Sequence, residues 1–354
     1  MKIARSEIIP VVMPQTDPNW RFALGGKSRT PAFLLKLITD DGGVGLGYTG
    51  ASASHHGVTP GGIRAALQLY ADHLVGHDPF HVERLLGMLD RVLHGNPGPQ
   101  SAMEMALNDL RAKTLGVPLY ALLGGLVREE IPIMRILSLK EPAEMASKAA
   151  ELVEQGFTYL KIKLSGETRR DVERVAAIRR AVGESIHLTV DANQMYLPKT
   201  AIDALKRMKE YGIDMCEQPV RDDNWEGLAD VKRATDCFIE AHESVKSLVD
   251  VFGLVKGGMV DSLNLKIDQL GGLRNTKTAA AICKLGNVSC RIGCTGSQIL
   301  SAVSMHFVAS TENVADGCEL GEFARISEDP VYGLEIINGK LRVPTGPGIG
   351  VSIR

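Results

Sequence analysis

Short apolar runs alternate with helical segments between residues 131 and 320, and this alternation constrains the fold more than any other feature. Each run is followed by a polar turn and a helix-forming segment, which is the sequence form of a parallel βαβ unit. The eight runs span residues 131–137, 159–164, 187–191, 214–217, 238–241, 262–267, 289–293 and 314–320. Eight such units predict a (β/α)8 barrel, whose reactive groups lie at the C-terminal ends of the strands.

A doubly wound open sheet is the alternative fold for the same alternation. That fold carries a glycine-rich phosphate loop after its first strand. Residues 137–145, which follow the first apolar run, contain no glycine. The barrel is therefore the preferred prediction.

The first 125 residues have a different pattern. Residues 33–47 predict two strands joined by a tight Asp-Gly turn, and residues 61–75 and 99–123 predict helices. Residues 339–344 predict a short strand, which we expect to pack against this N-terminal unit. We therefore predict an α+β domain at residues 1–125, completed by residues 321–354, and a barrel domain at residues 126–320.

The composition excludes several classes of protein. Hydrophobic residues make up 44% and charged residues 23% of the chain, as in soluble globular proteins. Forty basic and 42 acidic side chains are evenly mixed, which argues against a nucleic-acid partner. No apolar run approaches the ~18 residues of a membrane span, and Arg5 and Glu7 interrupt any signal-peptide core. We expect a cytoplasmic protein without a membrane partner.

Charged side chains recur at the ends of successive predicted strands. They are Lys161 and Lys163, Asp191 and Asn193, Glu217, His242 and Glu243, and Lys266. From Lys163 to Lys266 the successive strand ends lie 24 to 28 residues apart, which is about one βα repeat. We therefore expect these side chains to lie at one level of the barrel.

Acidic residues on three neighbouring strand ends predict a metal site. Carboxylates brought together would repel one another, and a divalent cation removes this repulsion. Asp191, Glu217 and the pair His242-Glu243 offer mainly hard oxygen ligands, which suit Mg²⁺. The flanking lysines either pair with these carboxylates or act as bases. Lys161 and Lys163, two residues apart on one strand, point to the same face.

Two further segments carry a resemblance to a known family. Residues 102–125, from Ala-Met-Glu-Met to the Gly-Gly turn, and residues 343–350, Val-Pro-Thr-Gly-Pro-Gly-Ile-Gly, resemble the muconate-lactonizing subgroup of the enolase superfamily, as do the strand ends. The similarity runs nearly end to end. It implies an α+β capping domain that closes over a modified barrel, and a homo-oligomer.

The resemblance also implies roles for individual residues. Asp191 and Glu217 match the first two Mg²⁺ ligands. Lys163 and Lys266 match the two acid/base catalysts on opposite faces of the substrate. Further residues match supporting positions: Lys161 matches a lysine that holds the substrate carboxylate, Asn193 matches a polar residue behind the ligands, and Glu319, on the eighth strand, lies where it would orient substrate.

One departure from the subgroup concerns the third ligand. The family has an Asp before Glu-Ser, whereas this chain has His242-Glu243-Ser244. Imidazole is a less favoured Mg²⁺ ligand than a carboxylate. Three hypotheses remain: His242 binds the metal, Glu243 replaces it, or the site accepts Mn²⁺.

The implied chemistry removes the proton α to a metal-bound carboxylate and forms an enediolate. Cycloisomerisation of a muconate-like diacid is the preferred reaction. Racemisation or epimerisation of an N-acyl amino acid or dipeptide, dehydration of a hydroxy acid, and a non-catalytic carboxylate-binding role are the alternatives. The substrate depends on two cap loops, residues 15–30 and 52–62, the second of which includes His55 and His56.

Overall fold

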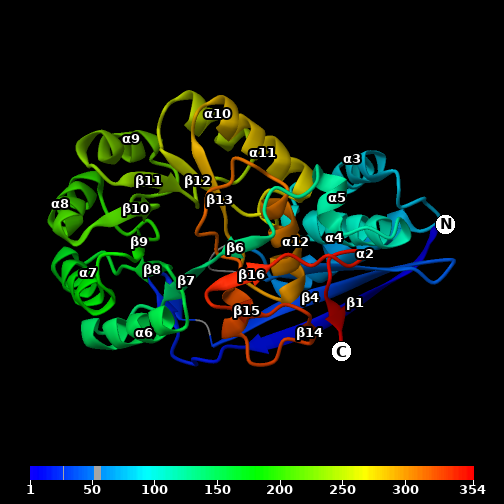
Figure 1. The fold of residues 1–354 in the computed structure, drawn as a ribbon. Helices are drawn as coiled ribbons and strands as arrows, with labels where there is room; N and C mark the ends of the chain where they lie inside the picture. Colours follow the sequence, from blue (N-terminus) through cyan, green and yellow to red (C-terminus); the bar gives the residue numbers. More distant parts are fainter. Residues whose placement is uncertain (27, 52–56) are drawn as a thin grey trace.

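The structure, a computed structural model, describes residues 1–26, 28–51 and 57–354 (Figure 1). The loop histidines His55 and His56 lie outside the described residues. Within this part of the chain, no helix has the length and apolar character needed to cross a membrane.

Seven parallel strands form one curved sheet in chain order, as the alternation predicts (Figure 1). They are β7 (Met134–Leu137), β8 (Tyr159–Lys163), β9 (His187–Asp191), β10 (Ile213–Glu217), β11 (Phe238–Ala241), β12 (Ser262–Leu265) and β13 (Ser289–Ile292). Helices follow the strands and cover the outside of the sheet: α6 (Pro142–Glu154), α7 (Thr168–Val182), α8 (Pro198–Met208), α9 (Trp225–Ala234), α10 (Leu248–Lys256), α11 (Leu273–Leu285) and α12 (Gln298–Ala309). The predicted modified barrel is confirmed.

The eighth predicted strand, residues 314–320, is not a regular strand. It closes the barrel through isolated bridges, from Val314 and Glu319 to the β13 side and from Cys318 to Ile133. Gly317 interrupts the extended backbone, because its φ is +75° and a side chain there would meet the ring of Tyr159. The first predicted strand is also divided, into β6 (Glu130–Pro132) and β7.

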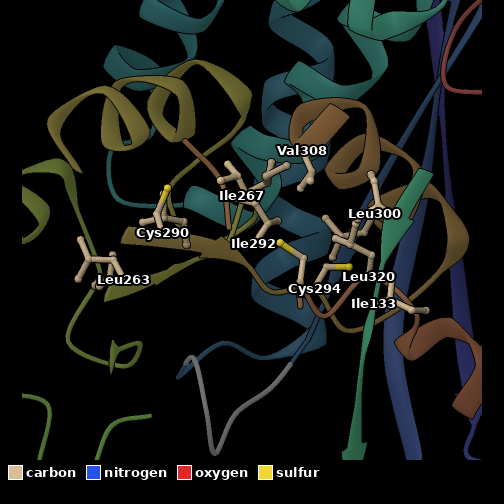
Figure 2. Close-up of a cluster of buried hydrophobic side chains, with 14 of the residues drawn as sticks. Ile133, Leu263, Ile267, Cys290, Ile292, Cys294, Leu300, Val308 and Leu320 are labelled. Atoms are coloured by element: carbon tan, nitrogen blue, oxygen red, sulfur yellow. Dashed lines mark hydrogen bonds between the residues drawn. The ribbon is translucent and has the colours of Figure 1, made fainter. Parts of the chain in front are cut away.

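The alternation of side chains along each strand separates an apolar shell from a polar interior. Leu263 on β12 and Cys290 and Ile292 on β13 belong to the hydrophobic cluster that includes Leu300 and Val308 of α12 (Figure 2). The residues between them, including Asn264 and Arg291, point the other way and are also buried. The barrel interior therefore holds buried polar groups beneath the strand ends.

An antiparallel sheet and three helices form the N-terminal unit beside the barrel (Figure 1). Its strands are β1 (Ile3–Pro14), β4 (Arg29–Thr39) and β5 (Val44–Gly50), and its helices are α2 (Pro60–Leu74), α3 (Val82–Val92) and α4 (Pro97–Thr114). A small hairpin of β2 (Arg21–Phe22) and β3 (Gly25–Gly26) lies in the first cap loop, and α5 (Leu119–Leu123) leads towards the barrel. Helix α4 packs very closely on β5, since a side chain at Gly45 or Gly47 would overlap the helix backbone.

The C-terminal segment consists of η2 (Glu322–Arg325), β14 (Val331–Tyr332), β15 (Ile336–Ile337), β16 (Lys340–Arg342) and β17 (Ser352–Ile353). The prediction that residues 339–344 pack against the N-terminal unit is wrong. Strand β16 pairs with β15 and β6, and the register places Leu341 opposite Ile131, both fully buried. It is residues 326–327 that pair with the end of β1.

Glu104 of α4 links the N-terminal unit to the barrel. Its side chain is 3% exposed, and its Oε1 accepts a hydrogen bond of 3.0 Å from the backbone N–H of Arg274 at the start of α11. Burial raises the pKa of Glu104 to about 7, although the Arg274 N–H favours the ionised form. Folding therefore buries a carboxylate that the unfolded chain would leave in water.

We expect Glu104→Gln to remove a pH dependence of stability. Because the folded-state pKa lies above the unfolded one, the ionised carboxylate destabilises the fold increasingly as pH rises from about 4.5 to 7, by ~3 kcal/mol at most. Thermal unfolding should show that the stability of the variant relative to the wild type increases over this pH range and stays constant above it. Glu83→Gln, an exposed partner of the same Arg274, is the control. A parallel pH dependence in wild type and Glu104→Gln would contradict the argument.

Candidate active site

A cavity opens at the C-terminal ends of the barrel strands, under the cap loop. Its barrel side includes Lys161, Lys163, Asp191, Asn193, Glu217, His242, Lys266 and Glu319, and its cap side includes Trp20, Phe22, Tyr48 and Arg325. Every residue that the sequence nominates lies here except Glu243, which lies directly behind. Its Oε1 accepts a hydrogen bond of 3.0 Å from the Asn193 side chain.

Lys161 is the most deeply buried cation of the site, with 1% of its side chain exposed. Its Nζ forms ion pairs with Glu217 and Glu319 and lies 3.6 Å from Asp191 Oδ2. Although burial by itself lowers the pKa of Lys161, these carboxylates raise it well above its ordinary value. Lys161 is therefore a fixed positive charge.

Lys163 and Lys266 differ in their surroundings. Lys163 Nζ lies 2.5 Å from Asp191 Oδ2, 3.0 Å from Asn193 Oδ1, and 5.7 Å from the centre of the Phe22 ring. Lys266 is 7% exposed, and its ammonium has no hydrogen-bond or ion-pair partner among the residues that the structure describes. Since four strand positions separate β8 from the end of β12 in a closed ring of eight, the two lysines enter the cavity from opposite sides.

Two carboxylates meet at the His242 imidazole. His242 Nδ1 lies 3.0 Å from Glu217 Oε1 and 3.4 Å from Glu243 Oε2. Burial by itself raises the pKa of Glu217, but Lys161 and His242 outweigh it and hold the pKa well below its usual range. Glu217 is therefore an anion at neutral pH.

The donor chemistry of this corner fits a hard divalent cation. Asp191, Glu217 and Glu243 are buried carboxylates on adjacent strand ends, and Glu217 Oε1 and Glu243 Oε2 converge on His242 Nδ1. Asp191 and Glu217 are paired with lysines, and Glu243 contacts Asn193 and His242. Within residues 1–26, 28–51 and 57–354, no three His, Cys, Asp or Glu side chains are grouped as a ready metal site.

Sequence reasoning missed Gln218, which shapes the end of β10. It has a positive φ of 36°, and its Oε1 accepts hydrogen bonds from the backbone N–H groups of His242, at 2.8 Å, and Ser244, at 3.2 Å. The amide thereby fixes the segment that carries His242 and Glu243.

It also missed the polar layer below the cavity. Asn264 Nδ2 donates to Glu217 Oε2 at 3.1 Å and to Glu319 Oε1 at 3.0 Å, so it holds together the two carboxylates that contact Lys161. Arg291 forms an ion pair with Glu240 beneath them. The signal was available, because Asn264 precedes Lys266 by two residues and thus shares its inward face.

Two family models together match most of the chain. Residues 6–124 match the mandelate racemase/muconate lactonizing enzyme N-terminal domain, and residues 144–354 match the enolase C-terminal domain-like model.

Individual relatives cover nearly the whole chain. The hydrophobic dipeptide epimerase of Enterococcus faecalis is 32% identical over 337 residues, 95% of each chain. The chloromuconate cycloisomerase CbnB of Cupriavidus necator is 30% identical over 332 residues, covering 91% of this chain and 89% of the relative. A crystal structure of the Enterococcus faecalis dipeptide epimerase with Mg and the dipeptide L-Leu-L-Tyr superposes with a TM-score of 0.96 at 31% identity, covering 99% of this chain and 100% of that one. This chain therefore belongs to the mandelate racemase/muconate lactonizing enzyme family of the enolase superfamily, and it is an isomerase.

Proposed function

We propose that this isomerase is a racemase or epimerase that inverts the carbon α to the carboxylate of an N-acyl amino acid or a dipeptide. The observation that carries the proposal is the entry of Lys163 and Lys266 into one cavity from opposite sides. A carbon held between two such groups can lose a proton from one face and regain it on the other.

The relatives support this reaction over the cycloisomerisation that the sequence favoured. Named epimerases and racemases match at identities up to 32%. Cycloisomerisation of a muconate-like acid stays the second candidate, because chloromuconate cycloisomerases match at 30%.

Lys161 supplies electrostatic stabilisation in this mechanism. Removal of the α-proton places negative charge on the substrate carboxylate. A buried, permanently charged ammonium stabilises that charge without having to reorganise. Lys163 and Lys266 accept and return the proton.

Asp191 and Glu217 would hold a Mg²⁺ ion, with Glu243 as the third ligand. Glu243 is preferred to His242 because a carboxylate oxygen is the harder donor for Mg²⁺. When bound, Mg²⁺ acts as a Lewis acid that makes the α-proton of the carboxylate more acidic. Mn²⁺, with the same charge, is the alternative metal.

The test is proton exchange in D2O with Mg²⁺ and a panel of N-acyl-L-amino acids and L,L-dipeptides. We expect deuterium at the α-carbon by NMR together with the inverted configuration by chiral chromatography. Dialysis against EDTA should abolish both, and Mg²⁺ should restore them. Turnover of cis,cis-muconate without exchange in any panel member would favour the second candidate.

A further inference from the structure

The position of Lys266 depends on the turn that follows β12, because its ammonium has no hydrogen-bond or ion-pair partner among the residues that the structure describes. Residues 266–272 connect β12 to α11. The backbone N–H of Leu270 donates to the Lys266 carbonyl at 3.0 Å, and that of Gly272 donates to the Ile267 carbonyl at 2.8 Å. Both hydrogen bonds reach the first residues of the turn, so a displacement of the turn would move the backbone that carries Lys266.

Helix α11 begins directly after this turn without a cap of its own. Its N-cap residue is Gly272, which has no side chain to bind the free N–H groups of the first helical turn. Glu104 of α4 takes this role from the N-terminal unit, because its Oε1 accepts a hydrogen bond of 3.0 Å from the backbone N–H of Arg274. A carboxylate suits this position, since it also meets the positive end of the helix dipole.

Two glycines allow α4 to approach the turn this closely. Gly271 and Gly272 have φ values of +81° and +126°, a region that favours glycine. A side chain at Gly272 would overlap the Glu104 carboxylate, and one at Gly271 would lie 3.3 Å from Oε1 of Gln100. Glu104 and Gln100 are one helical turn apart on α4, and both are buried. The polar face of this helix therefore packs directly on the backbone of the turn.

Lys163 is placed by the barrel instead. Its Nζ contacts Asp191 and Asn193, and the backbone N–H of Leu164 donates to the Asp191 carbonyl at 2.9 Å. Asp191 and Asn193 lie at the end of β9, which pairs with β8. A change at Glu104 therefore bears on Lys266 and leaves these contacts of Lys163 intact.

On the basis of the two-base reaction proposed above, we infer that Glu104 is a positioning residue for Lys266. The N-terminal unit holds the turn through this carboxylate, and the turn sets the distance between the Lys266 amine and the substrate α-carbon. Proton transfer depends on such placement, and a displacement of about 1 Å is enough to cost a factor of about 100 in rate. Because Glu104 acts through the turn, it affects the face of the substrate that Lys266 serves and not the face that Lys163 serves.

The experiment measures exchange of the α-proton with D2O in Mg²⁺-loaded protein, separately for the two α-carbon configurations of the panel compound that the wild type exchanges fastest. Lys266→Ala identifies the configuration whose proton faces β12, as the one whose exchange it abolishes. We expect Glu104→Ala to slow exchange of this configuration by about 10- to 100-fold and to change exchange of the other by less than about threefold. An unfolded fraction would lower both rates equally, so the ratio of the two rates reports positioning apart from stability.

Three further variants separate positioning from the loss of a buried side chain. Glu104→Gln keeps a neutral acceptor for the Arg274 N–H and should hold the ratio within about threefold of the wild type. Glu104→Asp leaves the carboxylate one methylene short, so it should lower the ratio as alanine does, and it replaces alanine if that variant does not fold. Asn108→Ala, on the same face of α4, removes a buried side chain whose hydrogen bonds, among the described residues, stay within the helix, and it should leave the ratio unchanged.

Amide hydrogen exchange followed by mass spectrometry tests the same link without turnover. We expect Glu104→Ala to speed exchange of the segment 266–274 by about fivefold, the fold-change that corresponds to the loss of one helix cap, while the segment 159–165 stays unchanged. Equal slowing of both configurations, or unchanged amide exchange at 266–274, overturns the positioning role while the two-base reaction stands. If Lys266→Ala leaves both α-proton rates intact, the proposed function fails and the positioning role fails with it.

Discussion

Alanine in place of Lys266 or Lys163 is expected to lower racemisation by at least ~100-fold, the lower range for loss of general acid–base catalysis. Each variant should fail at a different step. In Lys266→Ala, which keeps Lys163, only the enantiomer whose α-proton faces β8 can exchange that proton with D2O. In Lys163→Ala, which keeps Lys266, only the opposite enantiomer can exchange. NMR of each enantiomer separately with each variant measures this directly.

The two lysines have different partners, so the two variants should differ in their effect on metal affinity. Lys163 is held by Asp191 and Asn193, so its removal leaves Asp191 Oδ2 with the more distant Lys161 Nζ, at 3.6 Å. Lys266 has no such partner among the described residues, so its removal should leave metal affinity unchanged. Lys246→Ala, at an exposed ion pair with Asp222, is the control. Full racemisation in either active-site variant would refute the two-base mechanism, and exchange lost in one variant for both enantiomers would indicate a one-base reaction.

Glu217→Gln is expected to weaken Mg²⁺ binding by at least ~100-fold, because changes even outside the ligand shell reach that size. The substitution keeps the shape of the side chain and removes a charge. Glu217 is buried and anionic beside Lys161 and His242, so an amide there offers the cation only a weak neutral oxygen.

The matched variant for this metal prediction is His242→Asp, which adds a hard oxygen at the same corner and should tighten Mg²⁺ binding. Calorimetric titration of metal-free protein measures both changes, and Glu226→Gln on the exposed start of α9 controls for net charge. Unchanged Mg²⁺ affinity in Glu217→Gln would remove Glu217 from the ligand set.

The sequence predicts the barrel and most of the candidate site for one physical reason. In a (β/α)8 barrel every strand ends at the same face, so residues separated by one βα repeat become neighbours. Asp191, Glu217 and Lys266 could thus be placed together without knowledge of the helices between them. The two-residue period of a strand likewise predicted that Lys161 and Lys163 share a face.

Features that depend on contacts between segments distant in the sequence could not be predicted from the sequence. Gly317, which breaks the eighth strand, has a positive φ, and the ring of Tyr159 occupies the space that a side chain would need there. The pairing of β16 with β6 depends on which sheet edge is open, and apolar patterning does not encode that. Arg325 lies in a short helix after the barrel, and its place under Trp20 follows from how that segment crosses the cap.

That crossing has a consequence for how the protein forms on the ribosome. Strand β1 pairs with β4 through to Pro14, but at this end it also contacts the segment around Ile326, and 313 residues separate Pro14 from its hydrogen-bond partner Ser327. Contacts of such long sequence separation form slowly, and an uncovered strand edge is a template for wrong pairing. The end of β1 therefore lacks this neighbour until the C-terminal segment has been synthesised, and we expect chaperones to engage the growing chain there.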